Sequence, residues 1–312
     1  MPEPSLVPEP APVPEPHPAP EPAPVPPSVS VPEPTLVFLL GITKRSGTNF
    51  LFDLLREHPD IEMRPPLWED YVLERIGPVA DFAAGLTGLW RDWWDMDQSE
   101  ADRFVRAIGA GIESYLTEDA TTRFVLLKTP TPANLHLAPL LFPRSPLILL
   151  VRDGRQVVDS ARLSFGTGEE ETTWRWADGG RQILGFLADA GQSREPGPAR
   201  LLVRYEDLVA DTETQLRRVF GALGADPETY DYARAANLPV RGSSVVRGGA
   251  RQVHWEPVAR PEDFDPLTHH PAWEPERLAA FAAVAGDVLE AFGYPPLNEP
   301  PGRARGAHRI SS

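Results

Sequence analysis

Residues 36–56 read LVFLLGITKRSGTNFLFDLLR: an apolar run, a short basic turn with glycine and serine, and then apolar residues at helical spacing. This order predicts a buried strand over 36–40, a turn over 41–47 and a helix over 48–58. The free backbone N–H groups at the start of such a helix point back into the turn, where the basic and hydroxyl side chains add charge and donors. A turn of this kind binds phosphate or sulfate.

A Walker A loop is the first candidate for this turn, and the spacing argues against it. That motif has four residues between its glycines, followed by Lys and then Ser or Thr. Here five residues separate Gly41 from Gly47, and Thr48 follows directly. The Walker lysine is therefore missing, and a kinase-like nucleoside triphosphate enzyme is kept only as an alternative.

The turn instead resembles the 5′-phosphosulfate-binding loop of sulfotransferases that use 3′-phosphoadenosine 5′-phosphosulfate (PAPS). That loop follows the first strand and reads Lys or Arg, Ser, Gly, Thr, and residues 45–48 match it. The resemblance implies a P-loop-like three-layer α/β fold, in which helices flank a central, mainly parallel sheet. It also implies that the residues of this loop bind the donor. They are Lys44, Arg45, Ser46, Gly47, Thr48 and Asn49.

Residues 147–165, LILLVRDGRQVVDSARLSF, extend the resemblance. The apolar run at 147–151 predicts a strand, and Asp153 is expected to cap a helix that follows it. In sulfotransferases an Arg at the end of such a strand and a Ser eight residues later bind the 3′-phosphate of the donor. Arg152 and Ser160 have this spacing, and an arginine presents a rigid fork of donors that suits a phosphate. The structural alternative is that Arg152 and Asp153 merely form a surface ion pair and a helix cap.

Three further segments resemble sulfotransferase motifs. Tyr205, in Arg-Tyr-Glu-Asp-Leu, matches a tyrosine that packs near the nucleotide. Lys128, in Lys-Thr-Pro, matches a lysine beside the reacting sulfuryl group. Arg247 and Gly248 stand where the family has an Arg-Lys-Gly segment that closes over the 3′-phosphate, although the middle lysine is missing here. The matches run in the expected order from about residue 36 to 255.

The resemblance implies transfer of a sulfuryl group from PAPS to a hydroxyl or amine of an acceptor. By analogy with phosphoryl transfer, the protein should hold the reacting groups in line and offset the developing charge. Arg45 and Lys128 are the residues expected to do this. Because the transferred group carries only one negative charge, no metal ion is predicted. The rival interpretation is a member of the fold that serves as a non-catalytic scaffold.

A general base for the acceptor is expected among the carboxylates that follow the first helix. Pro130 stands where cytosolic sulfotransferases of phenols and steroids carry a catalytic histidine. Sulfotransferases of protein tyrosine or glucosamine use a glutamate after the first helix instead. Glu69, expected at the start of a helix over 68–76, is the favoured base, and Glu62 and Asp70 stay open. A carboxylate there is also commonly just the N-terminal charge of a helix.

Composition predicts three regions in the chain. The first 34 residues hold 15 prolines and five glutamates without Lys or Arg, which predicts a disordered, extended tail over 1–34. This tail is interpreted as a spacer or, less favoured, as a ligand for a proline-recognising partner. Residues 35–297 are expected to form the sulfotransferase domain, and 298–312 a flexible C-terminal tail.

Charge and cysteine content exclude several classes of partner and site. The formal net charge is −15, which weighs against nucleic acid and against an anionic membrane surface. No run of 18 apolar residues or basic signal peptide is recognised, so no integral membrane contact and a cytoplasmic location are expected. Seven histidines without cysteine predict neither a zinc framework nor a thiol nucleophile.

The acceptor and the oligomeric state are left open by the sequence. Four tryptophans precede the Lys128 segment, and an aromatic wall suits a sugar face, a phenol or a lipid equally well, while tryptophan is also a common core residue. The expected partner is therefore a small-molecule, glycan or lipid acceptor. The four are Trp68, Trp90, Trp93 and Trp94.

Overall fold

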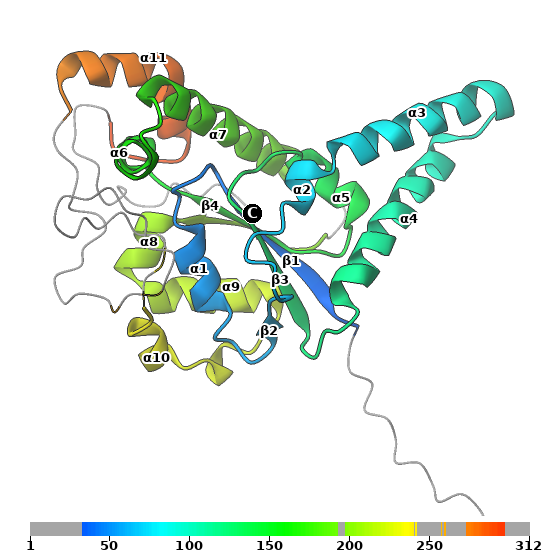
Figure 1. Ribbon diagram of the computed structural model, residues 1–312, viewed down its shortest axis with the longest axis horizontal. Helices are drawn as coiled ribbons and strands as arrows, with labels where there is room; N and C mark the ends of the chain where they lie inside the picture. Colours follow the sequence, from blue (N-terminus) through cyan, green and yellow to red (C-terminus); the bar gives the residue numbers. More distant parts are fainter. Residues whose placement is uncertain are drawn as a thin grey trace, which may run out of the picture. The chain divides into compact units, whose positions relative to one another are not determined.

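A five-stranded parallel sheet forms the centre of the computed structural model, which describes residues 33–192, 197–239, 241, 257, 259 and 273–296 (Figure 1). The strand order is β2-β3-β1-β4-β5. The strands are β1 (Thr35–Gly41), β2 (Ile61–Glu62), β3 (Phe124–Thr129), β4 (Leu147–Val151) and β5 (Arg200–Arg204). The predicted α/β fold with a parallel sheet is confirmed.

The three inner strands are buried along almost their whole length. They are apolar on both faces, as expected for a parallel sheet that helices cover on each side. β1 lies in the middle, with Phe38 opposite Leu127 of β3 and Leu147 of β4. After β1 the chain crosses toward β2, whereas after β4 it crosses to β5 on the other side. The carboxyl ends of β1 and β4 therefore flank a topological switch point, where open α/β sheets bind ligands.

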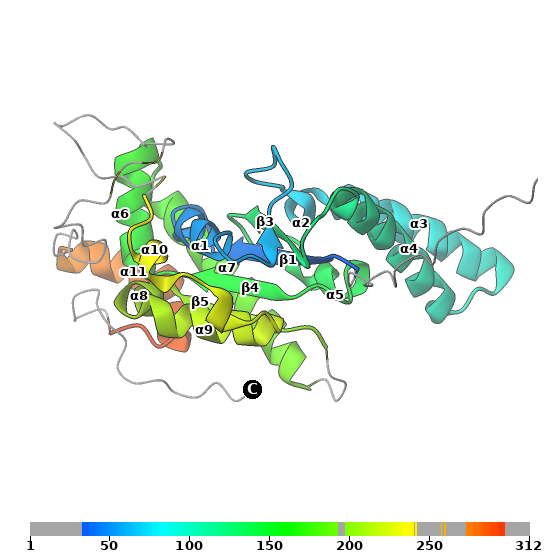
Figure 2. The same cartoon turned by 90° about the horizontal axis from the view of Figure 1, so that it is seen from below.

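Helices form a layer on each face of the sheet, as Figures 1 and 2 show from two directions. One layer packs on the cluster that includes Val37, Leu39 and Ile148, and the other on the cluster that includes Phe38, Leu40 and Leu149. The first layer holds α1 (Thr48–Leu55), α8 (Tyr205–Ala210), α9 (Thr212–Leu223) and α10 (Tyr232–Ala236). The second holds α4 (Gln98–Thr117), α5 (Ala138–Leu141), α6 (Gly154–Phe165), α7 (Glu169–Gln192) and α11 (Pro275–Ala291).

The long helix α3 (Gly77–Trp94) and three short elements complete the connections between the strands. The short elements are α2 (Val72–Arg75) and the 3₁₀ turns η1 (Leu135–Leu137) and η2 (Pro227–Thr229). No helix in the part of the chain that the structure describes combines the length and apolar character needed to cross a membrane.

Two predicted helices differ from those observed. The helix expected over 68–76 begins only at Val72, because Tyr71 has a φ of 54° and Asp70 accepts the Val72 N–H with its side chain. Glu69 consequently lies in the loop before α2. The helix expected over 48–58 ends at Leu55, ahead of His58, whose following proline disfavours helical backbone.

Candidate active site

The loop after β1 is closed by its own serine. Ser46 is buried, donates its hydroxyl to the Thr43 carbonyl at 2.5 Å and accepts the Thr43 N–H at 3.3 Å. Arg45 and Gly47 both have left-handed backbone, with φ of 76° and 93°. Gly47 directly precedes α1, so the free N–H groups of that helix start at this loop. Contacts within the loop therefore hold its backbone in this conformation without a ligand.

Tyr205, the first residue of α8, lies against this loop. A Cβ atom on Gly47 would come within 2.4 Å of the Tyr205 ring, so only glycine fits at this point of contact. The guanidinium of Arg152 stands 4.5 Å from the centre of the same ring. Tyr205 therefore contacts both the loop after β1 and Arg152, the residue that follows β4.

The two motifs that the sequence assigned to the ends of the donor meet in one place. Arg45 Nε donates to Ser160 Oγ of α6 at 3.0 Å, and Arg152 Nη1 donates to the Arg45 carbonyl at 3.3 Å. Burial, followed by the charge of Arg152, lowers the pKa of Arg45 to about 10. Two guanidinium groups are thus held together in a partly buried site, where an anion would offset their repulsion.

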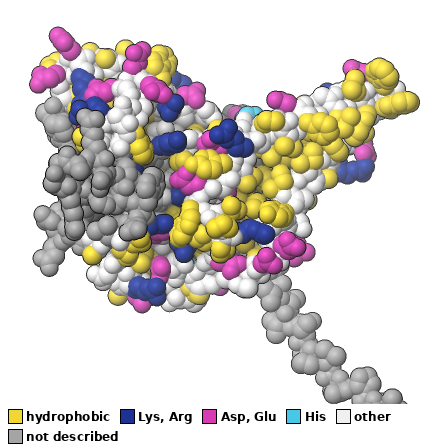
Figure 3. Space-filling model, viewed as in Figure 1, with side chains coloured by type: hydrophobic (Ala, Val, Ile, Leu, Met, Phe, Trp, Pro, Cys, Tyr) yellow, Lys and Arg dark blue, Asp and Glu magenta, His cyan; other side chains and the backbone are white. Residues whose placement is uncertain are grey.

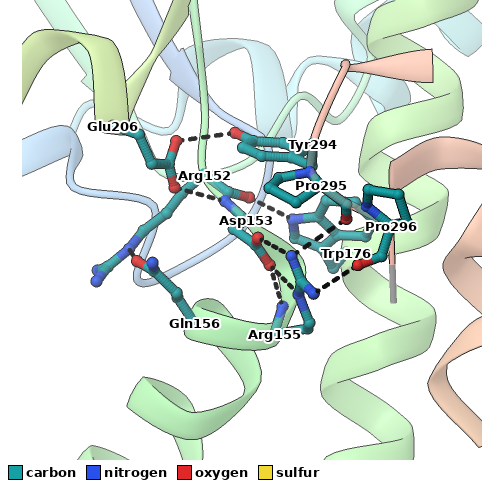
Figure 4. A network of polar contacts seen from close by, with 9 residues as sticks. All are labelled: Arg152, Asp153, Arg155, Gln156, Trp176, Glu206, Tyr294, Pro295 and Pro296. Atoms are coloured by element: carbon teal, nitrogen blue, oxygen red, sulfur yellow. Dashed lines mark hydrogen bonds and ion pairs between the residues drawn. The ribbon is translucent and has the colours of Figure 1, made fainter. Parts of the chain in front are cut away.

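Figure 4 shows how the backbone of Arg152 is fixed from behind. Trp176 of α7 donates its indole N–H to the Arg152 carbonyl at 2.9 Å. The next N–H, that of Asp153, is donated to Glu206 Oε1 at 2.9 Å, and Tyr294 donates its hydroxyl to Glu206 Oε2 at 3.1 Å. The peptide that carries the Arg152 side chain is therefore clamped on both sides. Burial raises the pKa of Glu206 to about 7.

Asp153 serves α6 and the C-terminal segment. Its carboxylate accepts the Arg155 N–H at 2.9 Å, which confirms the predicted cap, and binds the Arg155 guanidinium at 2.7 Å. Arg155 in turn donates to the carbonyls of Pro295 and Pro296 (Figure 4). Asp153 is fully buried. The alternative of a surface ion pair for this aspartate is therefore wrong.

Lys128 and Glu69 form a second group of polar side chains. Lys128, near the end of β3, is only 3% exposed; its Nζ donates to Asn49 Oδ1 of α1, and to Glu69 Oε1 at 3.3 Å. Tyr71 donates its hydroxyl to the other oxygen of Glu69. Burial lowers the pKa of Lys128, and the hydrogen bond to Glu69 raises the pKa of Tyr71 to about 12. Both oxygens of Glu69 are therefore held by donors.

The other two carboxylates considered as bases have structural partners. Asp70 caps α2 through the Val72 N–H at 2.8 Å and accepts the Thr129 hydroxyl at 3.3 Å, and burial raises its pKa. Glu62 accepts the backbone N–H and the hydroxyl of Thr121 at 2.8 and 2.7 Å. Glu62 pairs with Val125, toward the opposite end of β3 from Lys128. Of the three carboxylates, Glu69 is the one that accepts a hydrogen bond from the Lys128 ammonium group.

The remaining predicted site residues are placed as follows. Lys44 is exposed on the loop, and Thr48 is buried at the first position of α1. Arg247 and Gly248 lie outside the described residues, so their assignment stays a prediction. In the ranges that the structure describes, no group of three or more His, Asp or Glu side chains is arranged to hold a metal ion.

Beside Glu69 lies a cluster that the sequence did not predict. Arg241 Nε donates to Asp53 Oδ2 at 2.8 Å, and its guanidinium stands 4.4 Å from the centre of the Trp68 ring. Arg56 approaches the same ring at 5.2 Å. Trp68 keeps 48% of its surface exposed. Nothing in the sequence pairs residue 53 with residue 241, because the contact forms only once Arg241 has been brought against α1 by the fold.

Comparison with known proteins decides the family. The sequence pattern of the sulfotransferase family matches residues 34–229. The chain belongs to this family. It is 30% identical over 225 residues to the nodulation protein NoeE of Sinorhizobium fredii, covering 64% of this chain and 52% of NoeE. It is 25% identical over 287 residues to protein-tyrosine sulfotransferase A of Caenorhabditis elegans, covering 85% of this chain and 68% of that protein.

Solved structures of similar fold include other sulfotransferases. The sulfotransferase domain of the Synechococcus PCC 7002 olefin synthase is 22% identical, with a TM-score of 0.49 over 84% of this chain and 96% of that domain. The chain spans about half the length of NoeE.

Proposed function

We propose that this chain transfers a sulfuryl group from PAPS to a hydroxyl or amine of an acceptor. The observation that best supports the proposal is the junction of Arg45 with Ser160 and Arg152. It joins the two motifs that the family uses for opposite ends of one nucleotide, at the switch point of the sheet.

The chemistry of the donor fits the residues present. Two like charges, Arg45 and Arg152, are held together, and an anionic ligand would stabilise both. Gly47 leaves room for the Tyr205 ring against the loop, and the start of α1 supplies N–H groups. When bound, PAPS would supply the sulfuryl group. We assign the phosphosulfate end to the loop over 44–49 and the 3′-phosphate to Arg152 and Ser160, with Arg247 and Gly248 as further ligands.

We assign the role of general base to Glu69. Lys128 and Tyr71 donate to its two oxygens, which fixes the orientation of the carboxylate and keeps it beside the cation. In this role Glu69 accepts the proton of the acceptor hydroxyl at a carboxylate oxygen. Lys128, oriented by Asn49, stabilises negative charge that develops near its ammonium group.

The acceptor is proposed only as a class. A small molecule, glycan or lipid with a nucleophilic hydroxyl fits the half-exposed Trp68 ring beside Glu69, because an aromatic face packs on sugar, phenol or acyl surfaces. One relative bears the name protein-tyrosine sulfotransferase, so tyrosine peptides join the acceptors to be tested. A cytoplasmic location and the disordered tail over 1–34 stay predictions.

Calorimetric titration tests the donor part of this proposal. We expect 3′-phosphoadenosine 5′-phosphate to bind, and ATP with Mg²⁺ to bind far more weakly. The reverse preference would support the kinase alternative instead. Transfer of labelled sulfate from PAPS to phenols, glycans, lipids and tyrosine peptides then identifies the acceptor. Nucleotide binding without transfer to any of these, unaffected by Glu69→Gln, would support the non-catalytic scaffold.

A further inference from the structure

Helices α3 and α4 form an antiparallel arm beside the sheet (Figures 1 and 2). They pack on each other through one face of α3, on which Ala83 and Thr87 are buried. Near the tip of the arm, the rings of Trp90 and Phe104 lie 5.1 Å apart, edge to face. The face of α3 that carries Ala83 and Thr87 is thus buried within the chain and is not available to a partner.

A second face of α3 is apolar and exposed. Phe82, Leu86, Leu89 and Trp93 follow each other at steps of four, three and four residues, so they form one stripe along the helix. Phe82 is 62%, Leu89 54% and Trp93 73% exposed. Figure 3 shows hydrophobic side chains spread along this arm. Soluble monomers seldom expose an apolar stripe of this length, so the stripe is expected to contact a binding partner.

The types of residue in the stripe follow the same order, aromatic, leucine, leucine, aromatic, from either end of α3. Large aromatic residues, Phe82 and Trp93, stand at its ends, and two leucines, Leu86 and Leu89, stand between them. In an antiparallel pair of identical helices centred on this stripe, Phe82 lies opposite Trp93 of the second copy and Leu86 opposite its Leu89. A two-fold interface requires such self-complementarity, because if one residue of the first copy contacts a second residue of the other copy, the reverse contact forms as well.

A glycine at the edge of the stripe allows close packing. Gly85 lies three residues after Phe82 and four before Leu89, and a Cβ atom on it would meet nothing within 4 Å, so no neighbour inside the chain requires this glycine. A glycine within a helix is less stable than alanine by about 1 kcal/mol. Without a side chain at this position, a second helix can approach the stripe closely.

Surface area and charge favour a second copy over a lipid surface. Phe82 and Trp93, the two aromatic residues of the stripe, together present roughly 300 Å² of ring surface. Stable interfaces bury roughly 800 Å² on each partner, so these two rings supply more than a third of that area. Residues 77–117 carry three arginines against seven carboxylates, which repels anionic lipid.

We propose that the exposed stripe of α3 is the two-fold interface of a homodimer. Sedimentation of the full chain at micromolar concentration tests this, and we expect twice the 34.4 kDa mass of one chain. Leu89→Glu buries a charge in the interface and Trp93→Ser removes an aromatic anchor, so each should weaken the dimer at least tenfold. Trp174→Ser, which removes a 52% exposed tryptophan from α7, is the matched control and should leave the dimer intact. Circular dichroism checks that each variant folds.

Cross-linking locates the interface independently of stability. The chain has no cysteine, so Leu86→Cys introduces a single thiol next to the expected two-fold axis. A short bismaleimide should then join two copies, whereas Leu163→Cys on α6 should give no such product. A monomeric unaltered chain, a dimer that survives both Leu89→Glu and Trp93→Ser, or cross-linking through residue 163 in place of 86 would overturn the proposal. So would a monomer that sediments with neutral phosphatidylcholine vesicles.

Discussion

Arg45 and Ser160 lie 115 residues apart in the sequence, and the guanidinium Nε of Arg45 donates a hydrogen bond of 3.0 Å to the hydroxyl of Ser160. This bond links the loop after β1 to the helix after β4, across the switch point of the sheet. It also brings Arg45 close to Arg152, whose guanidinium donates to the Arg45 carbonyl. The proposed 5′-phosphosulfate loop and the proposed 3′-phosphate site are therefore in direct contact.

The first prediction concerns this pair of arginines. Arg45→Ala and Arg152→Ala should each weaken binding of 3′-phosphoadenosine 5′-phosphate roughly 10- to 100-fold, because a hydrogen bond to a charged group contributes about 1.5–3 kcal/mol. Ser160→Ala should weaken it less, since the lost donor is neutral. Calorimetric titration measures all three. Arg162→Ala removes an exposed arginine from the same helix α6 and is the control. Unchanged affinity in both the Arg45 and the Arg152 variant would refute the proposed site.

The second prediction concerns Gly47. In Gly47→Ala the new methyl group would collide with the Tyr205 ring, in backbone that disfavours any side chain, so we expect weaker nucleotide binding and lower stability. Gly221→Ala on α9 is the matched control, because its Cβ meets nothing within 4 Å and alanine favours the helix by about 0.5–1 kcal/mol. Chemical denaturation and titration with the nucleotide measure both effects. A Gly47→Ala protein as stable as the unaltered chain would contradict the contact.

The sequence predicted the parts of this fold that depend on local pattern. The strands at 36–40 and 147–151 are uninterrupted apolar runs, and the Asp153 cap needs only neighbouring residues. These features are encoded within a few positions, so they could be recognised before the chain was folded. The loop over 44–49 could be located for the same reason.

The clamp behind Arg152 could not be predicted in this way. Trp176, Glu206 and Tyr294 come from α7, α8 and the segment after α11, and no pattern in the sequence relates them. The helix start at Val72 was missed as well, because the left-handed backbone of Tyr71 overrides the helical periodicity of its neighbours. Long-range contacts and single backbone angles decide these features, and neither is visible in periodicity.

The third prediction concerns the buried carboxyl of Glu206. Its pKa rises from 4.5 to about 7 on folding, so between these pH values the folded protein binds more protons than the unfolded chain. The free energy of unfolding should therefore fall as the pH rises from about 4.5 to about 7, by roughly 2–4 kcal/mol from this group.

Urea denaturation at a series of pH values measures this dependence. Glu206→Gln removes the titrating group while keeping an acceptor for the Asp153 N–H, so the fall should be much smaller in this variant. Glu228→Gln changes an exposed carboxylate and should leave the pH dependence of the free energy of unfolding unaltered. A parallel dependence in the Glu206→Gln and unaltered proteins would show that this carboxyl does not titrate in the expected range.

The fourth prediction separates catalysis from binding at Glu69. Lys128 and Tyr71 hold the proposed base Glu69 in place, and a glutamine there cannot accept the proton of the acceptor. Glu69→Gln should therefore lower kcat by roughly 10²- to 10⁴-fold, while the affinity for 3′-phosphoadenosine 5′-phosphate stays nearly constant. Glu62→Gln should keep kcat, since that carboxylate binds Thr121. Asp70→Asn should keep kcat and most of the stability, because the amide oxygen can still accept the Val72 N–H at the start of α2. Transfer of labelled sulfate to the best acceptor of the screen measures kcat. Full turnover in Glu69→Gln together with its loss in Asp70→Asn would transfer the role of base to Asp70.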